Sequence, residues 1–148
     1  RDRSPSRGLG DVYKRQCKEN KELVKNIKQI DENIDKKEFN VIDARSLERF
    51  EGKVSEPRKG LRSGHIQNSF CLPFSLCINQ KTGEFKNLEE LRELFNQNVN
   101  IEKRLDQVFT CGSGVTAAVL AYAYKMVNND YIPKIYDGSW SEYGKYPA

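Results

Sequence analysis

The sequence has few of the residues that build metal sites in small domains. It contains one histidine and four cysteines, and no two cysteines stand in a CxxC pattern. A zinc finger with two cysteine and two histidine ligands is therefore excluded. The wide spacing of Cys17, Cys71, Cys77 and Cys111 also argues against a disulfide framework. We expect free thiols and a reducing compartment, either the cytoplasm or the mitochondrion.

Long apolar runs are missing as well. No stretch approaches the roughly 18 consecutive apolar residues of a membrane helix, and no secretory signal pattern opens the chain. We therefore expect no membrane partner. The 148 residues suffice for one α/β domain and are too few for two.

Positive charge is scarce outside the first residues. Residues 1–28 carry a net charge of +5, whereas the whole chain has a formal net charge of +4, which leaves about −1 for residues 29–148. Because a basic surface is the main signature of nucleic-acid binding, we expect no nucleic-acid partner.

The chain begins with arginine, and residues 1–16 (RDRSPSRGLGDVYKRQ) show no apolar periodicity. This segment is rich in Arg, Ser and Gly, as transit peptides and vector-derived sequences can be. We expect residues 1–16 to be a non-native or disordered leader, and residues 17–148 to form a single domain.

Three segments have the patterns of longer helices. Apolar residues recur at helical spacing along residues 18–36, which predicts an amphipathic helix with one buried face. Asn87 and Glu90 form a capping box, which predicts a helix from there to about Asn98. The largely apolar stretch 115–127 predicts a helix packed against a sheet.

Short apolar runs predict four strands, at residues 39–43, 69–74, 107–110 and 134–137. Shorter helices or turns are expected at 44–50 and 138–143, with a loop at 51–64. Because strands alternate with helices, we expect an α/β fold whose parallel sheet is flanked by helices on both faces.

Residues 107–118 (QVFTCGSGVTAA) combine a strand, a cysteine, a glycine-rich loop and a helix start. This order points backbone N–H groups and the positive end of a helix at the Cys111 sulfur, which favours the thiolate. Cys111 is thus a candidate nucleophile at the carboxyl end of a strand, where open α/β sheets bind ligands. A merely buried cysteine is the alternative reading of this stretch alone.

Five motifs follow one another in the chain: VIDAR at 41–45, GHI at 64–66, LPF at 72–74, CGSGVTA at 111–117 and YDGSW at 136–140. Together they resemble the rhodanese family and, more narrowly, the C-terminal catalytic half of 3-mercaptopyruvate sulfurtransferases. The resemblance runs from about residue 17 to residue 148. It implies a rhodanese-like fold and an N-terminal rhodanese half, missing from this sequence, that supplies an acidic residue to the site.

The resemblance also implies roles for individual residues. Cys111 would be the nucleophile that becomes a persulfide, and Ser113 would assist proton movement or polarise the substrate carbonyl. The other loop residues would surround the sulfur with N–H donors: Gly112, Gly114, Val115 and Thr116. The implied chemistry needs no metal and no organic cofactor. His65 is expected to be structural.

The neutral Gly-Ser-Gly centre of the loop suits a substrate held by its carboxylate elsewhere, whereas thiosulfate-preferring relatives carry basic side chains there. The family holds that carboxylate with two arginines nine residues apart, and Arg49 and Arg58 stand at the matching positions. The planar guanidinium fork suits a carboxylate. Arg45 and Arg62 lie near enough in the sequence to be mistaken for either.

The resemblance thus implies sulfur transfer from 3-mercaptopyruvate to a thiol or cyanide, with thioredoxin or a small thiol as acceptor. Sulfur transfer from thiosulfate is one alternative, and a non-catalytic rhodanese-like module for protein contacts is another, because fold alone does not establish function. Such modules usually lack the cysteine that this chain keeps. A Cx5R phosphatase is disfavoured, because Ala117 stands where its phosphate-binding arginine is needed.

Overall fold

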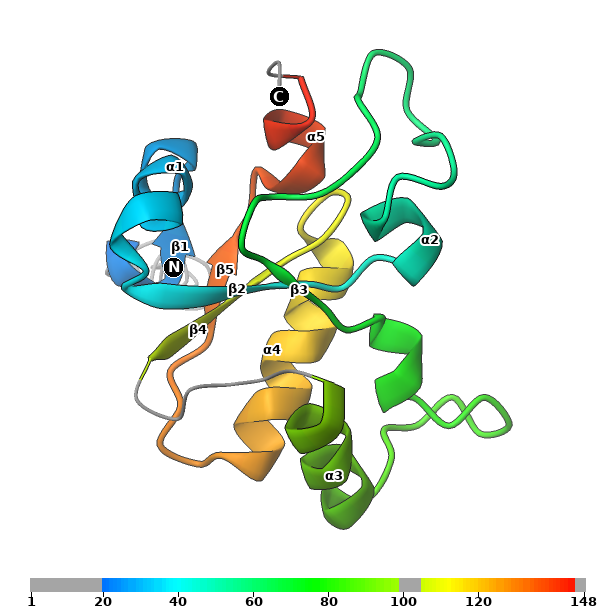
Figure 1. The fold of residues 1–148 in the computed structure, drawn as a ribbon. Helices are drawn as coiled ribbons and strands as arrows, with labels where there is room; N and C mark the ends of the chain where they lie inside the picture. Colours follow the sequence, from blue (N-terminus) through cyan, green and yellow to red (C-terminus); the bar gives the residue numbers. More distant parts are fainter. Residues whose placement is uncertain (1–19, 99–104, 146–148) are drawn as a thin grey trace, which may run out of the picture.

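The computed structural model describes residues 20–98 and 105–145. Within them, five strands form one parallel sheet in the order β1-β5-β4-β2-β3 (Figure 1). The elements in chain order are η1 (Lys21–Leu23), β1 (Val24–Lys25), α1 (Ile27–Lys36), β2 (Phe39–Asp43), α2 (Leu47–Phe50), β3 (Phe70–Cys71), η2 (Phe74–Cys77), α3 (Leu88–Asn98), β4 (Asp106–Thr110), α4 (Val115–Val127), β5 (Lys134–Tyr136) and α5 (Ser139–Tyr143).

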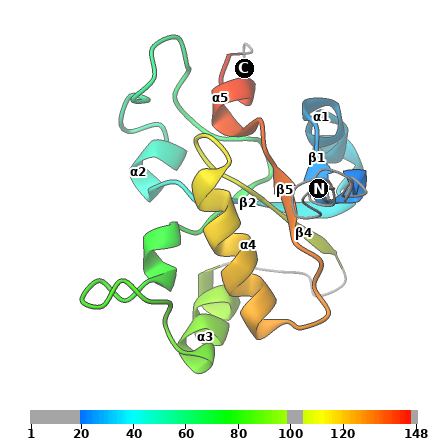
Figure 2. The same ribbon diagram turned by 180° about the vertical axis from the view of Figure 1, so that it is seen from behind.

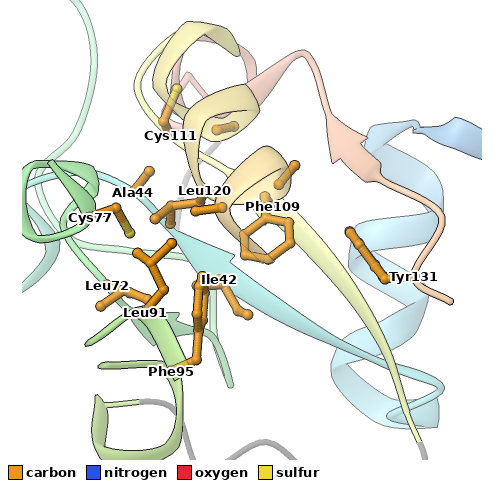
Figure 3. Close-up of a cluster of buried hydrophobic side chains, with 13 residues drawn as sticks. Ile42, Ala44, Leu72, Cys77, Leu91, Phe95, Phe109, Cys111, Leu120 and Tyr131 are labelled. Carbon is orange, nitrogen blue, oxygen red and sulfur yellow. The ribbon is translucent and has the colours of Figure 1, made fainter. Parts of the chain in front are cut away.

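Alternate residues of the central strands supply two separate cores. Ile42 of β2 and Phe109 of β4 pack with Leu91 of α3 and Leu120 of α4. This core is drawn in Figure 3, and Figure 2 views the sheet from the side of α4. Since successive side chains of a strand point to opposite faces, the next residues face the other way.

The second core joins the opposite face of the sheet to α1 and α5. Val41 and Val108 pack there with Ile30 of α1 and Trp140 of α5. Helices therefore cover both faces of the sheet, and the predicted α/β fold is confirmed.

The prediction of one helix over residues 18–36 was wrong for residues 20–26, and residues 18 and 19 lie outside the described residues. Val24 and Lys25 form strand β1, which pairs in parallel with Ile135 and Tyr136 of β5. The helix begins only after Asn26, whose side chain accepts the N–H of Gln29 in a capping box. Pairing with the sheet edge thus overrides the helical period before Asn26, and the sheet gains a strand that was not predicted.

Two other predicted elements are shorter than expected. The strand predicted at 69–74 is reduced to Phe70–Cys71, because Pro73 has no N–H to donate and precedes the 3-10 turn η2. The helix predicted at 44–50 begins at Leu47, because the N–H of Ala44 is bonded to Thr110 of β4 and still belongs to the sheet.

The other predicted elements are confirmed with small shifts. α4 has the predicted bounds, and α3 begins beside Asn87, whose capping box with Glu90 is formed. The strands predicted at 107–110 and 134–137 occupy 106–110 and 134–136. The fold brings the carboxyl ends of β2, β4 and β5 to one edge of the sheet, close to α2 and α5 (Figure 1). None of the helices in the described segments combines the length and apolar character needed to cross a membrane.

Candidate active site

Cys111 lies directly after β4, and the loop that follows it turns back onto the cysteine sulfur. The backbone N–H groups of Ser113 and Gly114 point at Cys111 Sγ, with nitrogen-to-sulfur distances of 3.4 and 3.0 Å. Helix α4 begins at Val115, so its positive end also faces the sulfur. Figure 3 shows Cys111 at the end of the apolar cluster, beside the start of this helix. The predicted strand–loop–helix geometry is confirmed.

Gly114 makes this tight turn possible. Its φ is +88°, in the left-handed region that side chains disfavour. A Cβ at this position would lie 2.6 Å from a carboxylate oxygen of Asp137. Residue 114 is therefore restricted to glycine both by its backbone conformation and by lack of space.

Hydrogen bonding holds the pKa of the Cys111 thiol below its ordinary value. Burial is the largest single influence and raises this pKa. Hydrogen bonds from the Thr116 hydroxyl and from the backbone N–H groups of Ser113, Ala117 and Thr116 stabilise the thiolate. Together they lower the pKa by more than burial raises it. The loop thus favours the thiolate form of Cys111.

The other described cysteines have the opposite character. Burial raises the pKa of Cys71 to about 12, and Asp43 adds to the shift. Burial raises the pKa of Cys77 to about 11. Both are free thiols whose surroundings oppose ionisation. Cys17 lies outside the described residues.

A cleft of about 240 Å³ opens beside Cys111 and brings together most of the predicted site residues. Its wall is built from the active-site loop, α2 and the long loop after α2. The lining residues are Arg49, Glu56, Pro57, Arg58, Leu61, Cys111, Gly112, Ser113 and Thr116. Gly114 is a buried residue of the loop, and Val115 is 72% exposed; neither lines the cleft.

Both predicted arginines lie beside the loop. Arg58 is exposed and donates from Nη1 to the Gly112 carbonyl oxygen over 3.2 Å. Arg49 is less exposed than Arg58, and its Nη2 would lie 3.0 Å from a Cβ at position 112. Glycine at 112 therefore leaves room for a guanidinium beside the cysteine. The two cations come from different segments and meet at one cleft.

The sequence patterns did not point to Glu56, which also lines this cleft. Its side chain is 1% exposed and forms salt bridges with Arg45 and Arg49, at 2.8 and 2.5 Å. Two acidic residues, Glu51 and Glu56, stand between Arg49 and Arg58, and the sequence alone does not distinguish them.

Arg45 and Arg62 are separated from Arg49 and Arg58 by their surroundings. Arg45 is buried, forms a bidentate pair with Asp43 and also donates to the Gly64 carbonyl oxygen. Arg62 stacks against the rings of Trp140 and Tyr143. Neither lines the cleft beside Cys111.

His65 lies apart from the cysteine chemistry. Its ring stacks on Phe50 with a centroid separation of 4.0 Å, and its Nδ1 is 2.8 Å from the Phe50 carbonyl oxygen. It does not line the cleft beside Cys111. These contacts fit the structural role expected of it.

Ser139 is a second residue of the site region that the sequence patterns did not single out. It is fully buried, and its hydroxyl oxygen lies 3.4 Å from the backbone nitrogen of Cys111. Its place in the motif YDGSW was the available signal, but only the tertiary structure brings this motif to the active-site loop.

Comparisons with known proteins agree with this geometry. Residues 26–146 match the family model described as the rhodanese-like domain. The chain is 39% identical over 126 residues to thiosulfate/3-mercaptopyruvate sulfurtransferase 1, mitochondrial, of Arabidopsis thaliana, covering 84% of this chain and 32% of that protein. It is 40% identical over 122 residues to 3-mercaptopyruvate sulfurtransferase of Homo sapiens, covering 82% of this chain and 40% of that protein.

A solved structure gives the same result for the fold. The crystal structure of SseA from Escherichia coli, described as a 3-mercaptopyruvate sulfotransferase, aligns with a TM-score of 0.67 and 32% identity over 83% of this chain and 44% of that one. The chain thus spans less than half the length of these relatives. Because the family model matches most of its length, the chain belongs to the family of rhodanese-like domains.

Proposed function

We propose that this chain is the catalytic half of a sulfurtransferase that takes sulfur from 3-mercaptopyruvate through a persulfide on Cys111. One observation carries the proposal: a cysteine with a lowered pKa faces a cleft that also holds two arginines. The thiolate supplies the nucleophile, and the arginines supply charge for a carboxylate. The names of the human and Arabidopsis relatives support this choice of substrate.

The reaction is a double displacement. The Cys111 thiolate attacks the sulfur of 3-mercaptopyruvate and forms a sulfur–sulfur bond. The carbon–sulfur bond breaks, its electron pair leaves with pyruvate as the enolate, and the enolate takes up a proton. An acceptor thiolate or cyanide then attacks the outer sulfur, so that the sulfur–sulfur bond breaks and the Cys111 thiolate returns.

Arg58 and Arg49 would hold the substrate carboxylate at the cleft. Arg58 is the more accessible of the two, since it is exposed and makes one bond to the Gly112 carbonyl oxygen. Arg49 directs Nε and Nη2 at Glu56, so part of its donor capacity is already used within the protein. Arg58 therefore makes the larger contribution to initial binding.

The loop would stabilise negative charge on sulfur through the whole cycle. The N–H groups of Ser113 and Gly114 and the Thr116 hydroxyl already point at Sγ before substrate arrives, so they need little reorganisation. Ser113 lines the cleft, where its hydroxyl would polarise the substrate carbonyl or assist proton movement.

The choice of donor rests on the charge of the loop. Residues 112–116 contain no charged side chain, which favours a donor held by its carboxylate over the compact thiosulfate dianion. Thiosulfate is the alternative donor, and the Arabidopsis relative carries both substrates in its name. The proposed acceptor is thioredoxin or a small thiol. The proposed compartment is the cytoplasm or the mitochondrion, and the Arabidopsis relative is described as mitochondrial.

Mass spectrometry of the chain after brief treatment with 3-mercaptopyruvate tests the proposal. We expect one added sulfur on the peptide that contains Cys111, and its removal by a small thiol. Cys111→Ser should gain none, and Cys77→Ser, which removes a buried thiol outside the cleft, should gain sulfur normally.

A second sample would join this chain to the N-terminal half of a relative, since the curated relatives are longer. If Cys111 gains sulfur only in the joined protein, the reaction needs residues from the N-terminal half as well as those of this chain. No loading in either sample would refute the proposed activity and favour the module for protein contacts.

A further inference from the structure

The first residues of α5 donate hydrogen bonds to the backbone of the active-site loop, residues 111–116. The N–H of Trp140 donates to the Cys111 carbonyl oxygen over 2.9 Å, and the N–H of Ser141 donates to the Gly112 carbonyl oxygen over 3.0 Å. Both carbonyl groups are thereby held on the side of the loop that faces α5. In Figure 1, α5 lies beside the loop that leads into α4.

Holding these carbonyl groups also orients the donors that face the cysteine sulfur. No cis peptide bond occurs in the described residues, so the C=O of Gly112 and the N–H of Ser113 point in opposite directions across their shared peptide plane. When Ser141 holds the Gly112 oxygen on one side, the Ser113 N–H must point to the other, where Cys111 Sγ lies 3.4 Å away.

The Ser139 side chain also holds the backbone of Cys111, from the buried side of the loop. Its hydroxyl donates to the Tyr136 carbonyl oxygen over 2.9 Å. It accepts at 3.4 Å from both the Thr110 hydroxyl and the Cys111 N–H. One donated and two accepted bonds use the full capacity of a hydroxyl group, and the side chain is fully buried. The hydroxyl thus ties the ends of β4 and β5 together at the catalytic cysteine.

The backbone of Ser139 is strained at this point. Its φ is +52°, a left-handed value that a residue other than glycine adopts at a cost in free energy. Glycine would adopt this conformation without strain but would lose the hydroxyl. Serine at this position is therefore explained by the bonds of its side chain and not by its backbone preference.

We propose that Ser139 is a positioning residue for the proposed sulfur transfer, fixing the Cys111 backbone so that the loop N–H groups point at Sγ. The inference rests on the proposed function only in assuming that the Cys111 thiolate takes part in sulfur transfer. Its test measures the thiolate itself, so it can fail or succeed whether or not sulfur transfer is observed.

The test compares the pH dependence of Cys111 alkylation by iodoacetamide in the unmodified chain, Ser139→Ala and Ser139→Gly, with the Cys111 peptide followed by mass spectrometry. Both variants remove the hydroxyl, and Ser139→Gly also relieves the strained φ. We expect the apparent pKa of Cys111 to rise by about half a unit or more in both, which lowers the thiolate fraction about three-fold at pH values below that pKa. The alkylation rate at high pH should be unchanged.

Ser141→Ala is the matched control. The Ser141 hydroxyl donates to the Gly138 carbonyl oxygen, whereas the contact with the loop is made by its backbone N–H and survives the substitution. This variant should keep the alkylation profile of the unmodified chain. Charged groups near the sulfur are Arg49, Glu56 and Arg58 across the cleft and Asp137 beside Gly114, and no variant changes them.

Near-UV circular dichroism verifies the fold of each variant. An unchanged profile in a folded Ser139→Gly or Ser139→Ala would overturn the assignment. So would a shift in Ser139→Ala alone, because that result would trace the effect to backbone strain. If Ser139→Ala does not fold, Ser139→Gly decides, and loss of folding in both would make Ser139 a folding residue and overturn the positioning role.

Discussion

Arg49 and Glu56 face each other in the wall of the Cys111 cleft, with Arg49 Nη2 2.5 Å from Oε2 and Arg49 Nε 3.2 Å from Oε1 of Glu56. The same carboxylate lies 2.8 Å from the buried Arg45. One acidic residue thus holds an arginine of the interior and an arginine of the cleft at a fixed separation. This connects the stability of the domain to the geometry of its proposed substrate site.

Glu56→Gln should destabilise the domain by about 3 kcal/mol, because it removes a buried negative charge shared by two guanidinium groups. Arg49 loses its carboxylate partner, and Arg45 keeps only Asp43. Urea unfolding followed by circular dichroism measures the loss. Glu48→Gln changes an exposed acid on α2 and should cost little. Equal unfolding midpoints for the two variants would contradict the shared ion pair.

Alkylation should distinguish the cysteines by pH. The pKa of Cys111 lies below its ordinary value, so its thiolate forms and reacts as the pH rises through a lower range than for an ordinary thiol. Cys71 and Cys77, with pKa values of about 12 and about 11, should stay largely protonated and unreactive near neutral pH. Rates for each peptide across the pH range give the three profiles. Uniform reactivity would refute an activated Cys111, and Cys17 is also expected to react more slowly than Cys111.

Arg58→Ala should weaken the use of 3-mercaptopyruvate more than the use of thiosulfate. Loss of a charge-assisted hydrogen bond of about 1.5–3 kcal/mol corresponds to a fall of about ten- to one-hundred-fold in kcat/KM for the carboxylate substrate. Arg49→Ala should act in the same direction. Steady-state kinetics with both donors provide the measurement.

Lys59→Ala is the control for these arginine variants, because Lys59 is an exposed neighbouring cation that does not line the cleft. It should leave kcat/KM for both donors nearly unchanged. If the arginine variants lose both donors equally, the arginines do not act as a carboxylate clamp.

Gly114→Ala should both destabilise the domain and raise the pKa of Cys111. The new Cβ would lie 2.6 Å from Asp137 Oδ1 and 3.1 Å from the Asp137 carbonyl oxygen, so the Asp137 side chain must turn away and the loop is pushed from its backbone. That displacement would lengthen the contact between the Gly114 N–H and the sulfur. Gly83→Ala has a similar positive φ of +74° but open space around it, so it reports the backbone strain alone. We expect Gly114→Ala to cost about 2 kcal/mol more than Gly83→Ala in chemical unfolding. Equal costs would mean that the contact with Asp137 does not constrain the loop.

The sequence by itself determined the parallel α/β fold and the loop around Cys111. Both follow from local patterns: short apolar runs for β2 and β4, a capping box at the start of α3, and glycines directly after the cysteine. The two arginines were predicted through the resemblance to the family, and the structure places both in the lining of the cleft. The fold and the loop depend on residues close together in the chain, so no knowledge of distant contacts is needed to recognise them.

Only the tertiary structure decided the features that depend on distant segments. Val24 and Lys25 become strand β1 because the edge of β5 offers them hydrogen-bond partners, against the helical period of their own segment. Glu56 becomes a buried partner of Arg45 and Arg49 only when the loop after α2 folds over the sheet edge. Ser139 contacts Cys111, 28 positions away in the sequence, because the parallel strands β4 and β5 end side by side. Burial and long-range hydrogen bonds assign these roles, and neither is encoded in the spacing of neighbouring residues.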